Sequence, residues 1–519
     1  MNKFYKYIIL AAFGFAACEP EFETSVENGD FYTNGEADFS NYVALGNSLT
    51  AGFADSALYL TGQQSSYPNI MAQQFELVGG GAFSQPLVND NLGGLLLNGT
   101  QVLDNRLVLT STSGANPAPA PLAGMPTTDI GNILEGPFNN MGVPGARVYH
   151  LPAPGYGNIA GLPNRANPYF VRFASASNAS IIEDAAAQAP TFFSLWIGNN
   201  DILTYATGGG VGVDQTGNPD PATYGSNDIT DPFIFGGIYK QLVDAMMVSA
   251  TGGVLINIPD VTSIPFFTTV PNNALVLNGQ QAAGLTGFFT AVSGIVKQGA
   301  IQNGVPEAQA EALANQYKIT FQEGANRFLI DVPVTPFNPL GFRQMTEEEL
   351  LVLTIDQSAL REQAYGAVAI TPQVLQVIGK LQLGGTPTEA EVATIFGAIN
   401  GIDDGDVLDN DELAAIKTAQ DAYNATIEGL ASANNLAFVD AEAILNEVAD
   451  QGIPFDGGVL TSVYGTGGAF SLDGVHPTPR GYAYIANQII AEINQQYGSS
   501  VPQVNIGNYP TITASNSVE

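Results

Sequence analysis

Cysteine and histidine, the residues that most often bind metals or cross-link a chain, are nearly absent. The 519 residues include one cysteine, Cys18, and two histidines, His150 and His476. A single cysteine excludes an internal disulfide and any cysteine-based metal site. Two histidines argue against a zinc site of the usual histidine-rich kind. We therefore expect neither a metal nor another cofactor.

Charge is scarce as well, and basic charge in particular. Charged residues make up 12% of the chain, with 15 Lys and Arg against 49 Asp and Glu, and the net charge is −34. A field of that sign repels phosphate backbones, so it excludes a nucleic-acid partner. It also disfavours flat docking on anionic lipid. Solubility is the simplest explanation of the acidic balance.

The N-terminus carries an apolar run that is too short to span a bilayer. Lys3 and Lys6 precede this run, which extends from Tyr7 to Ala17, and small residues lead up to Cys18. This order is that of a secretory signal, and the ending Phe-Ala-Ala-Cys resembles a bacterial lipobox, in which the cysteine is acylated. We expect residues 1–17 to be a lipoprotein signal peptide and Cys18 to be the lipid attachment site. An ordinary signal peptide is the alternative.

Residues 18–39 are acidic and polar and show no periodicity, so we expect a flexible tether there. The acidic residues directly after Cys18 resemble the surface-export signal of Bacteroidetes lipoproteins. The expected location is the cell envelope. The lipid would anchor the protein to a membrane, which we expect to be the outer membrane, and the protein would face either the periplasm or the cell surface.

Apolar runs that end at turn residues predict the strands of a buried parallel sheet. They are Tyr42–Leu45, a short run near Phe138–Met141, Thr191–Ile197, Gly253–Ile258 and Ala437–Val439. Helical stretches lie between or after them, at Tyr67–Phe75, Ile238–Val248, Asp411–Ala433 and Gly481–Tyr497. This alternation predicts an α/β fold with a central parallel sheet, and 45% hydrophobic residues can build its core.

Residues 265–410 interrupt the alternation of strand and helix. They contain helical stretches with capping boxes that begin at Thr346 and Thr388, so we expect a large, mainly helical insertion. The Gly- and Pro-rich stretch 77–136 is expected to form loops. The main domain would then cover residues 40–500, and a polar tail, loosely attached, would cover 501–519.

Two candidate blocks follow the first two predicted strands. In Gly-Asn-Ser-Leu-Thr at 46–50, Ser48 would stand on a tight turn between strand and helix, with its backbone N–H near a helix N-terminus. In Asn-Met-Gly-Val-Pro-Gly-Ala at 140–146, Gly145 could bring its N–H close to a carbonyl group, because no side chain blocks the approach. Taken singly, Ser48 is explained as an N-cap and Gly145 as a turn residue.

Two further blocks supply an amide and a possible base. Gly-Asn-Asn-Asp at 198–201 follows the Thr191–Ile197 strand, and the amide of Asn200 could donate to an oxyanion or simply form a turn. In Asp-Gly-Val-His-Pro at 473–477, Asp473 could orient His476 as a general base. The alternative is a capping aspartate with a surface histidine. His150 has no acidic neighbour in sequence, so we expect it to be a wall or surface residue.

Together and in this order, the four blocks resemble the SGNH/GDSL hydrolase family of esterases and lipases. The resemblance implies a three-layer α/β/α sandwich with a flavodoxin-like central sheet. It also implies that Ser48 is the nucleophile, that Asp473 and His476 are its supporting carboxylate and base, and that Gly145, Asn200 and the N–H of Ser48 form the oxyanion hole. The expected activity is hydrolysis of a carboxylic ester, either an acyl lipid or an acylated glycan. The family usually has Gly-Asp-Ser-Leu, and this chain has Asn47 in place of that aspartate.

Two other functions remain open at this stage. The first is a non-catalytic envelope lipoprotein that binds lipid or glycan on a hydrolase fold, since Asn47 and the large insertion allow it. The second is calcium binding by the acidic stretch 403–412. Its spacing does not fit an EF-hand loop, and a solvated loop with charges at a helix N-terminus explains it better.

Overall fold

A parallel five-stranded sheet forms the centre of the computed structural model, which describes residues 31–110 and 117–513. The strand order is β18-β9-β8-β1-β7, and every neighbouring pair is parallel. The strands are β1 (Tyr42–Gly46), β7 (Asn140–Gly142), β8 (Phe192–Trp196), β9 (Gly252–Ile256) and β18 (Ala437–Val439). The central parallel sheet predicted from the apolar runs is therefore confirmed, with boundaries that differ by at most two residues.

The central strands β1, β8 and β9 are buried because their alternate side chains enter two different hydrophobic clusters. In β1, Val43 and Leu45 belong to one cluster, and Tyr42 and Ala44 belong to the other. All five residues of β1 are buried. Strands covered on both faces need continuous apolar sequence, which explains why these runs do not alternate with polar residues.

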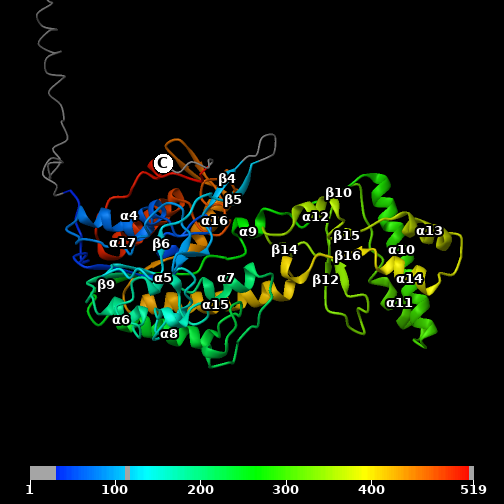
Figure 1. Ribbon diagram of the computed structural model, residues 1–519, viewed down its shortest axis with the longest axis horizontal. Helices are drawn as coiled ribbons and strands as arrows, with labels where there is room; N and C mark the ends of the chain where they lie inside the picture. The colour runs from blue at the N-terminus through cyan, green and yellow to red at the C-terminus, as the bar shows by residue number, and fades with distance from the viewer. Residues whose placement is uncertain (1–30, 111–116, 514–519) are drawn as a thin grey trace, which may run out of the picture.

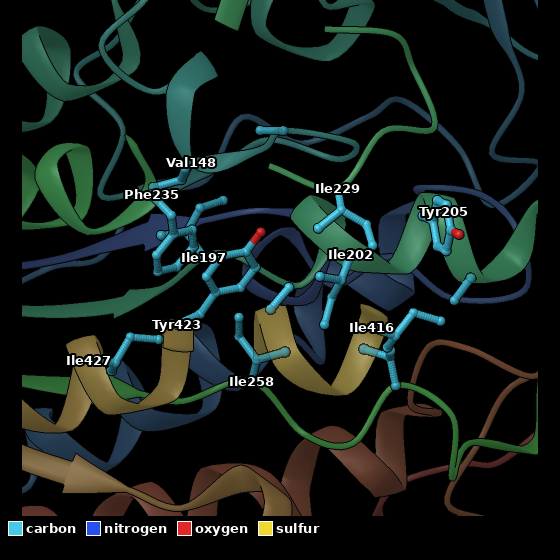
Figure 2. Close-up of a cluster of buried hydrophobic side chains, with 14 of the residues drawn as sticks. Val148, Ile197, Ile202, Tyr205, Ile229, Phe235, Ile258, Ile416, Tyr423 and Ile427 are labelled. Atoms are coloured by element: carbon cyan, nitrogen blue, oxygen red, sulfur yellow. The ribbon is translucent and has the colours of Figure 1, made fainter. Parts of the chain in front are cut away.

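Helices α6 (Ile181–Ala186), α7 (Asn200–Thr207), α8 (Pro232–Met246) and α15 (Asn410–Ala433) contribute to the first cluster. The ring of Tyr423 on α15 stacks on Phe235 of α8 with a centroid distance of 4.0 Å. Figure 2 shows both side chains within this cluster. Helix α8 begins six residues before the predicted Ile238, because Asp231 caps it by accepting from the N–H of Ile234, and Pro232 suits the first helical turn.

Helices α4 (Tyr67–Glu76), α16 (Ala441–Asp450) and α17 (Pro479–Tyr497) contribute to the second cluster. The last residue of α17 is tied to the sheet, since the hydroxyl of Tyr497 accepts from the N–H of Gly253 and donates to its carbonyl, both over 2.8 Å. Helix α17 therefore runs from the carboxyl edge of the sheet back to its amino edge.

Residues 265–410 extend away from the sheet as a second lobe (Figure 1). Its helices are α9 (Pro265–Thr268), α10 (Gly279–Gln302), α11 (Glu307–Asn315), α12 (Gln357–Glu362), α13 (Pro372–Gln382) and α14 (Glu389–Phe396). The lobe also contains four antiparallel strand pairs, so the expectation of a mainly helical insertion was incomplete. The pairs are β10 (Leu275–Leu277) with β11 (Gly324–Asn326), β12 (Leu329–Asp331) with β13 (Phe342–Gln344), β14 (Leu350–Leu351) with β17 (Val407–Leu408), and β15 (Ala367–Val368) with β16 (Ile399–Asn400).

Short elements also occur in the stretch expected to form loops and elsewhere around the sheet. They are α2 (Ser48–Ala51), α3 (Leu60–Gln64), β2 (Leu95–Leu97), β3 (Thr100–Leu103), β4 (Leu107–Thr110), β5 (Ala118–Pro121), β6 (Thr128–Asp129), α5 (Pro168–Val171), β19 (Ile453–Phe455) and β20 (Gly458–Leu460). Strands of two to four residues carry too little alternation to be recognised in a sequence.

Both ends of the described chain pack on the end of α17, which corrects two expectations. Ala37 and Phe39 are buried, and the N–H of Glu36 donates to the carbonyl of Tyr497, so the proposed tether does not extend to residue 39. Val501 and Ile506 are also buried, so the first part of the 501–519 tail is attached. The signal peptide 1–17 and Cys18 lie outside the described residues. Within 31–110 and 117–513, no helix is both long and apolar enough to cross a membrane.

Candidate active site

Ser48 lies at the carboxyl edge of the sheet, at the start of α2 and two residues after β1. Asn47 caps this short helix, with its side-chain oxygen accepting from the N–H of Leu49 over 3.0 Å. A side chain at Gly46 would collide with the carbonyl of Trp196, at 2.4 Å, so only glycine fits at the end of β1 beside β8. The serine is 6% exposed.

His476 connects Ser48 to Asp473, which comes from the loop before α17. The Nε2 atom of His476 lies 2.9 Å from the hydroxyl oxygen of Ser48, and its Nδ1 atom lies 2.9 Å from Oδ2 of Asp473. The ring of Phe53 packs against the imidazole with a centroid distance of 4.8 Å. The structure thus brings together the three residues for which the sequence suggested a joint role, across 428 positions of the chain between Ser48 and His476.

Hydrogen bonds hold the carboxylate of Asp473 in its ionised form. Its Oδ1 accepts from the backbone N–H groups of Val475 and His476, and its Oδ2 accepts from the N–H of Ser56. Burial alone would raise the pKa of Asp473, but His476 and these donors outweigh it and lower the pKa to about 2. An ionised Asp473 can orient the imidazole and stabilise the imidazolium.

A second buried carboxylate, Asp55, lies behind the Asp473 loop. Its Oδ1 accepts from the N–H of Leu472 over 3.0 Å, and its Oδ2 lies 3.6 Å from a guanidinium nitrogen of Arg106. The hydroxyl of Tyr59 also donates to this carboxylate. Burial, assisted by repulsion from Asp473, raises the pKa of Asp55 to about 6. Nothing in the spacing of these residues along the chain marks their contacts.

Two backbone N–H groups of the candidate blocks are left without a hydrogen-bond acceptor in the described part of the chain. Among the hydrogen bonds of the described residues, neither the N–H of Ser48 nor that of Gly145 has a protein acceptor. Gly145 is exposed, with φ +78°, and the position of a Cβ atom there would be almost free of contacts. Asn200 lines the same cavity as Ser48. Its Nδ2 donates to the carbonyl of Ala146 over 2.9 Å, which leaves its second N–H available.

A buried aspartate in the block that contains Asn200 contacts the segment just after the Gly145 block. Asp201 accepts from the N–H of Val148 over 2.9 Å and from the hydroxyl of Thr230 over 2.7 Å. Burial raises the pKa of Asp201 to about 6, although Arg147 and these donors act against the rise. Sequence reasoning placed Asp201 in the block without giving it this role.

Asn199 is another polar residue of the site that sequence reasoning did not single out. Its Oδ1 accepts from Nδ2 of Asn47 over 3.1 Å, and it lines the same cavity as Ser48. Asn47 itself is fully buried. The residue that departs from the GDSL pattern therefore links the serine turn to the turn at the end of β8.

His150 takes no part in this site. Its Nδ1 accepts from the N–H of Arg147 over 3.1 Å, and its ring stacks on Tyr156 at 4.4 Å. Burial and the neighbouring Arg147 lower the pKa of His150 to about 3. A histidine in this state is a neutral packing residue over the physiological range.

The acidic stretch 403–412 is used in helix capping. Asp409 caps α15 by accepting from the N–H groups of Asp411 and Glu412. Among the described residues, no three His, Cys, Asp or Glu side chains are grouped so that they could hold a metal ion.

The chain matches no family model, no curated protein and no solved structure.

Proposed function

We propose that this chain is a serine hydrolase of the SGNH/GDSL type that cleaves carboxylic esters. The observation that carries the proposal is the unbroken contact from Asp473 through His476 to Ser48, with both distances at 2.9 Å. The order of the four blocks supports it, as does their position at the carboxyl edge of a parallel sheet, where sites of α/β proteins gather. The finer fold assignment, a three-layer α/β/α sandwich, belongs to the same proposal.

The reaction follows from the positions of these groups. The hydroxyl oxygen of Ser48 attacks the ester carbonyl while Nε2 of His476 takes the proton, and Asp473 stabilises the resulting imidazolium. His476 then returns the proton to the leaving alcohol as the C–O bond of the ester breaks. Water then attacks the acyl-serine while His476 takes its proton, and His476 returns that proton to the oxygen of Ser48 as the acyl C–O bond breaks and the carboxylic acid leaves.

Three donors would stabilise the charge that develops on the carbonyl oxygen. They are the free N–H groups of Ser48 and Gly145 and the second amide hydrogen of Asn200. Such donors act strongly because they are fixed before the reaction begins, and removing one commonly lowers kcat by about 10²–10³-fold.

Labelling with a fluorophosphonate tests the proposal, because this reagent bonds covalently to an activated serine. Intact protein is expected to be labelled at Ser48 and inactivated, and Ser48→Ala is expected to remain unlabelled. Ser56→Ala is a matched control: Ser56 is exposed and contributes only its backbone N–H to Asp473. Folded protein that is neither labelled nor active on any ester would instead support a binding protein on a hydrolase fold.

The proposal includes a lipid anchor at Cys18, in the cell envelope. Its support is the signal-like N-terminus and the lipobox-like ending of that segment. Cys18→Ser is expected to move the protein from the membrane fraction to the soluble fraction. Continued membrane association of that variant would contradict the anchor and leave the hydrolase proposal untouched.

A further inference from the structure

A deep cavity opens beside the candidate nucleophile and continues between the sheet and helices α16 and α17. Its volume is about 100 Å³, and both Ser48 and His476 line it. Asn199 and Asn200 also line it. The groups proposed to cleave the ester therefore share this cavity with the rest of its lining, which can contact the substrate beyond the ester group.

The rest of the cavity wall is apolar and comes from several elements. Its side chains include Trp196 of β8, Ile256 of β9, Val439 of β18, Val448 of α16, Leu460 of β20 and Ile485 of α17. Five of these six are at most 5% exposed, so the wall belongs to the protein interior.

The polar atoms on this wall are already occupied. The indole N–H of Trp196 donates to the carbonyl of Asn257 over 3.0 Å, and the hydroxyl of Tyr484 donates to Glu447 over 3.1 Å. A sugar placed here would lose its hydrogen bonds to water without replacement, which is costly. A hydrocarbon chain would lose nothing and would gain from burial.

The cavity is long enough for an extended chain. Ala441 and Val448 both line it and are seven positions apart on α16, which corresponds to about 10 Å at the helical rise of about 1.5 Å per residue. With C–C bonds of about 1.5 Å, that length suits an extended acyl chain of about eight carbons.

We infer that this cavity binds the acyl chain of the substrate, and that the preferred substrates are esters of linear fatty acids of about eight carbons or more. The inference rests on the proposed function, because it places the ester group at Ser48. It selects acyl lipids over acetylated glycans: an acetyl group would leave the apolar part of the cavity empty.

Hydrolysis of p-nitrophenyl esters from acetyl to dodecanoyl measures this preference. Each methylene buried in the cavity is worth about fourfold in transition-state binding, so kcat/KM is expected to climb by about that factor per carbon and to level off near eight carbons. A kcat/KM that is flat or falls from acetyl to octanoyl would overturn the inference.

Val448→Phe fills the cavity away from Ser48 and is expected to reduce the octanoyl-to-acetyl ratio of kcat/KM at least about tenfold. Val459→Phe is the matched control, because Val459 is 56% exposed on β20 and does not line the cavity. It should leave the ratio as it is in the unmodified protein. An unchanged ratio in folded Val448→Phe protein would contradict the inference.

A binding measurement makes the test independent of turnover. Trp196 is the single tryptophan of the chain and lines the cavity, so its fluorescence reports on the cavity alone. In Ser48→Ala protein, octanoate brominated at carbon 4 or carbon 8 is expected to quench this fluorescence saturably, because bromine quenches on contact. Non-brominated octanoate should compete, and acetate should not.

The outcomes separate the two proposals. If hydrolysis persists in Ser48→Ala, the proposed function fails, and quenching still decides whether the cavity takes an acyl chain. If hydrolysis depends on Ser48 but does not respond to chain length, and neither brominated acid quenches Trp196, the acyl-chain assignment alone fails.

Discussion

The backbone N–H of Ser56 donates to Oδ2 of Asp473 over 2.9 Å, and this is the same oxygen that faces Nδ1 of His476. Ser56 and its neighbour Asp55 both adopt positive φ, at 63° and 53°. Non-glycine residues rarely adopt this conformation, and it persists only where the surroundings enforce it. The loop at residues 55 and 56 therefore orients the carboxylate of Asp473, which in turn orients His476. Asp55 is a positioning residue behind the Asp473 loop.

The first prediction concerns the pH dependence of stability conferred by Asp55. Its pKa is about 6 in the folded protein against 3.8 as the ordinary value, so the folded state binds more protons than the unfolded state between these pH values. The contribution of Asp55 to the free energy of unfolding is therefore largest below pH 4 and is lost as the pH rises through 6. A difference of about two pKa units corresponds to about 3 kcal/mol.

Asp55→Asn removes this titration and keeps the acceptor for the N–H of Leu472. The free energy of unfolding of the unmodified protein, minus that of the variant, should fall by about 2 kcal/mol between pH 4 and pH 7. Urea unfolding at both pH values measures it. A difference that stays constant, or grows with pH, would show that pairing with Arg106 dominates over burial.

The second prediction separates the two histidines. His476→Asn should lower kcat by about 10⁴-fold or more, since it removes the group between Ser48 and Asp473. His150→Asn should keep the activity, and the pH profile of kcat/KM should be unchanged above pH 5, because the pKa of His150 is about 3. Both profiles are measured with a water-soluble ester. A dead His150 variant beside an active His476 variant would reverse the assignment.

Much of the fold follows from the sequence because the sheet is buried on both faces. The runs at Tyr42 and Phe192 are unbroken apolar segments, and such segments are typical of strands that are covered on both faces of a sheet. The paired strands of the insertion were missed for the opposite reason. Leu350–Leu351 pairs with Val407–Leu408, more than fifty positions away, and two residues carry no periodic signal.

The candidate site likewise contains residues that the sequence predicts and contacts that it does not. Ser48, Gly145, Asn200, Asp473 and His476 were predicted because each lies in a short block next to a predicted strand or helix. Contacts that depend on tertiary packing could not be predicted, and the pairing of Arg106 with Asp55 is the clearest example. The scarcity of basic residues was the one available hint, because a buried arginine in so acidic a chain needs a partner.

The third prediction compares the two asparagines at the end of β8. Asn200→Ala should lower kcat by about 10²-fold with little effect on KM, since the second amide hydrogen of Asn200 is available to the oxyanion. Asn199→Ala should have a smaller effect on kcat, because Asn199 serves mainly as the acceptor for Asn47. Steady-state kinetics on one ester decides between them. The reverse order of effects would assign the oxyanion contact to Asn199.

The fourth prediction concerns Asn47, which replaces the aspartate of the GDSL pattern. Asn47→Asp keeps the acceptor for the N–H of Leu49 but removes the donor to Asn199. Rotation of the Asn199 amide can restore the contact by presenting Nδ2 to the new carboxylate. In the hydrogen bonds of the described residues, that Nδ2 has no protein acceptor to give up. We expect kcat to change by less than about threefold and the free energy of unfolding by about 1 kcal/mol.

A double-mutant cycle tests that explanation directly. Asn199→Asp alone should also be mild, because Nδ2 of Asn47 can donate to a carboxylate. The two changes together place two buried carboxylates side by side with no donor between them, so their combined loss of stability should exceed the sum of the single losses by about 2 kcal/mol. Urea unfolding at pH 7 gives the four free energies. Additive losses would show that Asn47 and Asn199 are not in contact, and a large fall in kcat for Asn47→Asp alone would show that the asparagine tunes the charge around Ser48.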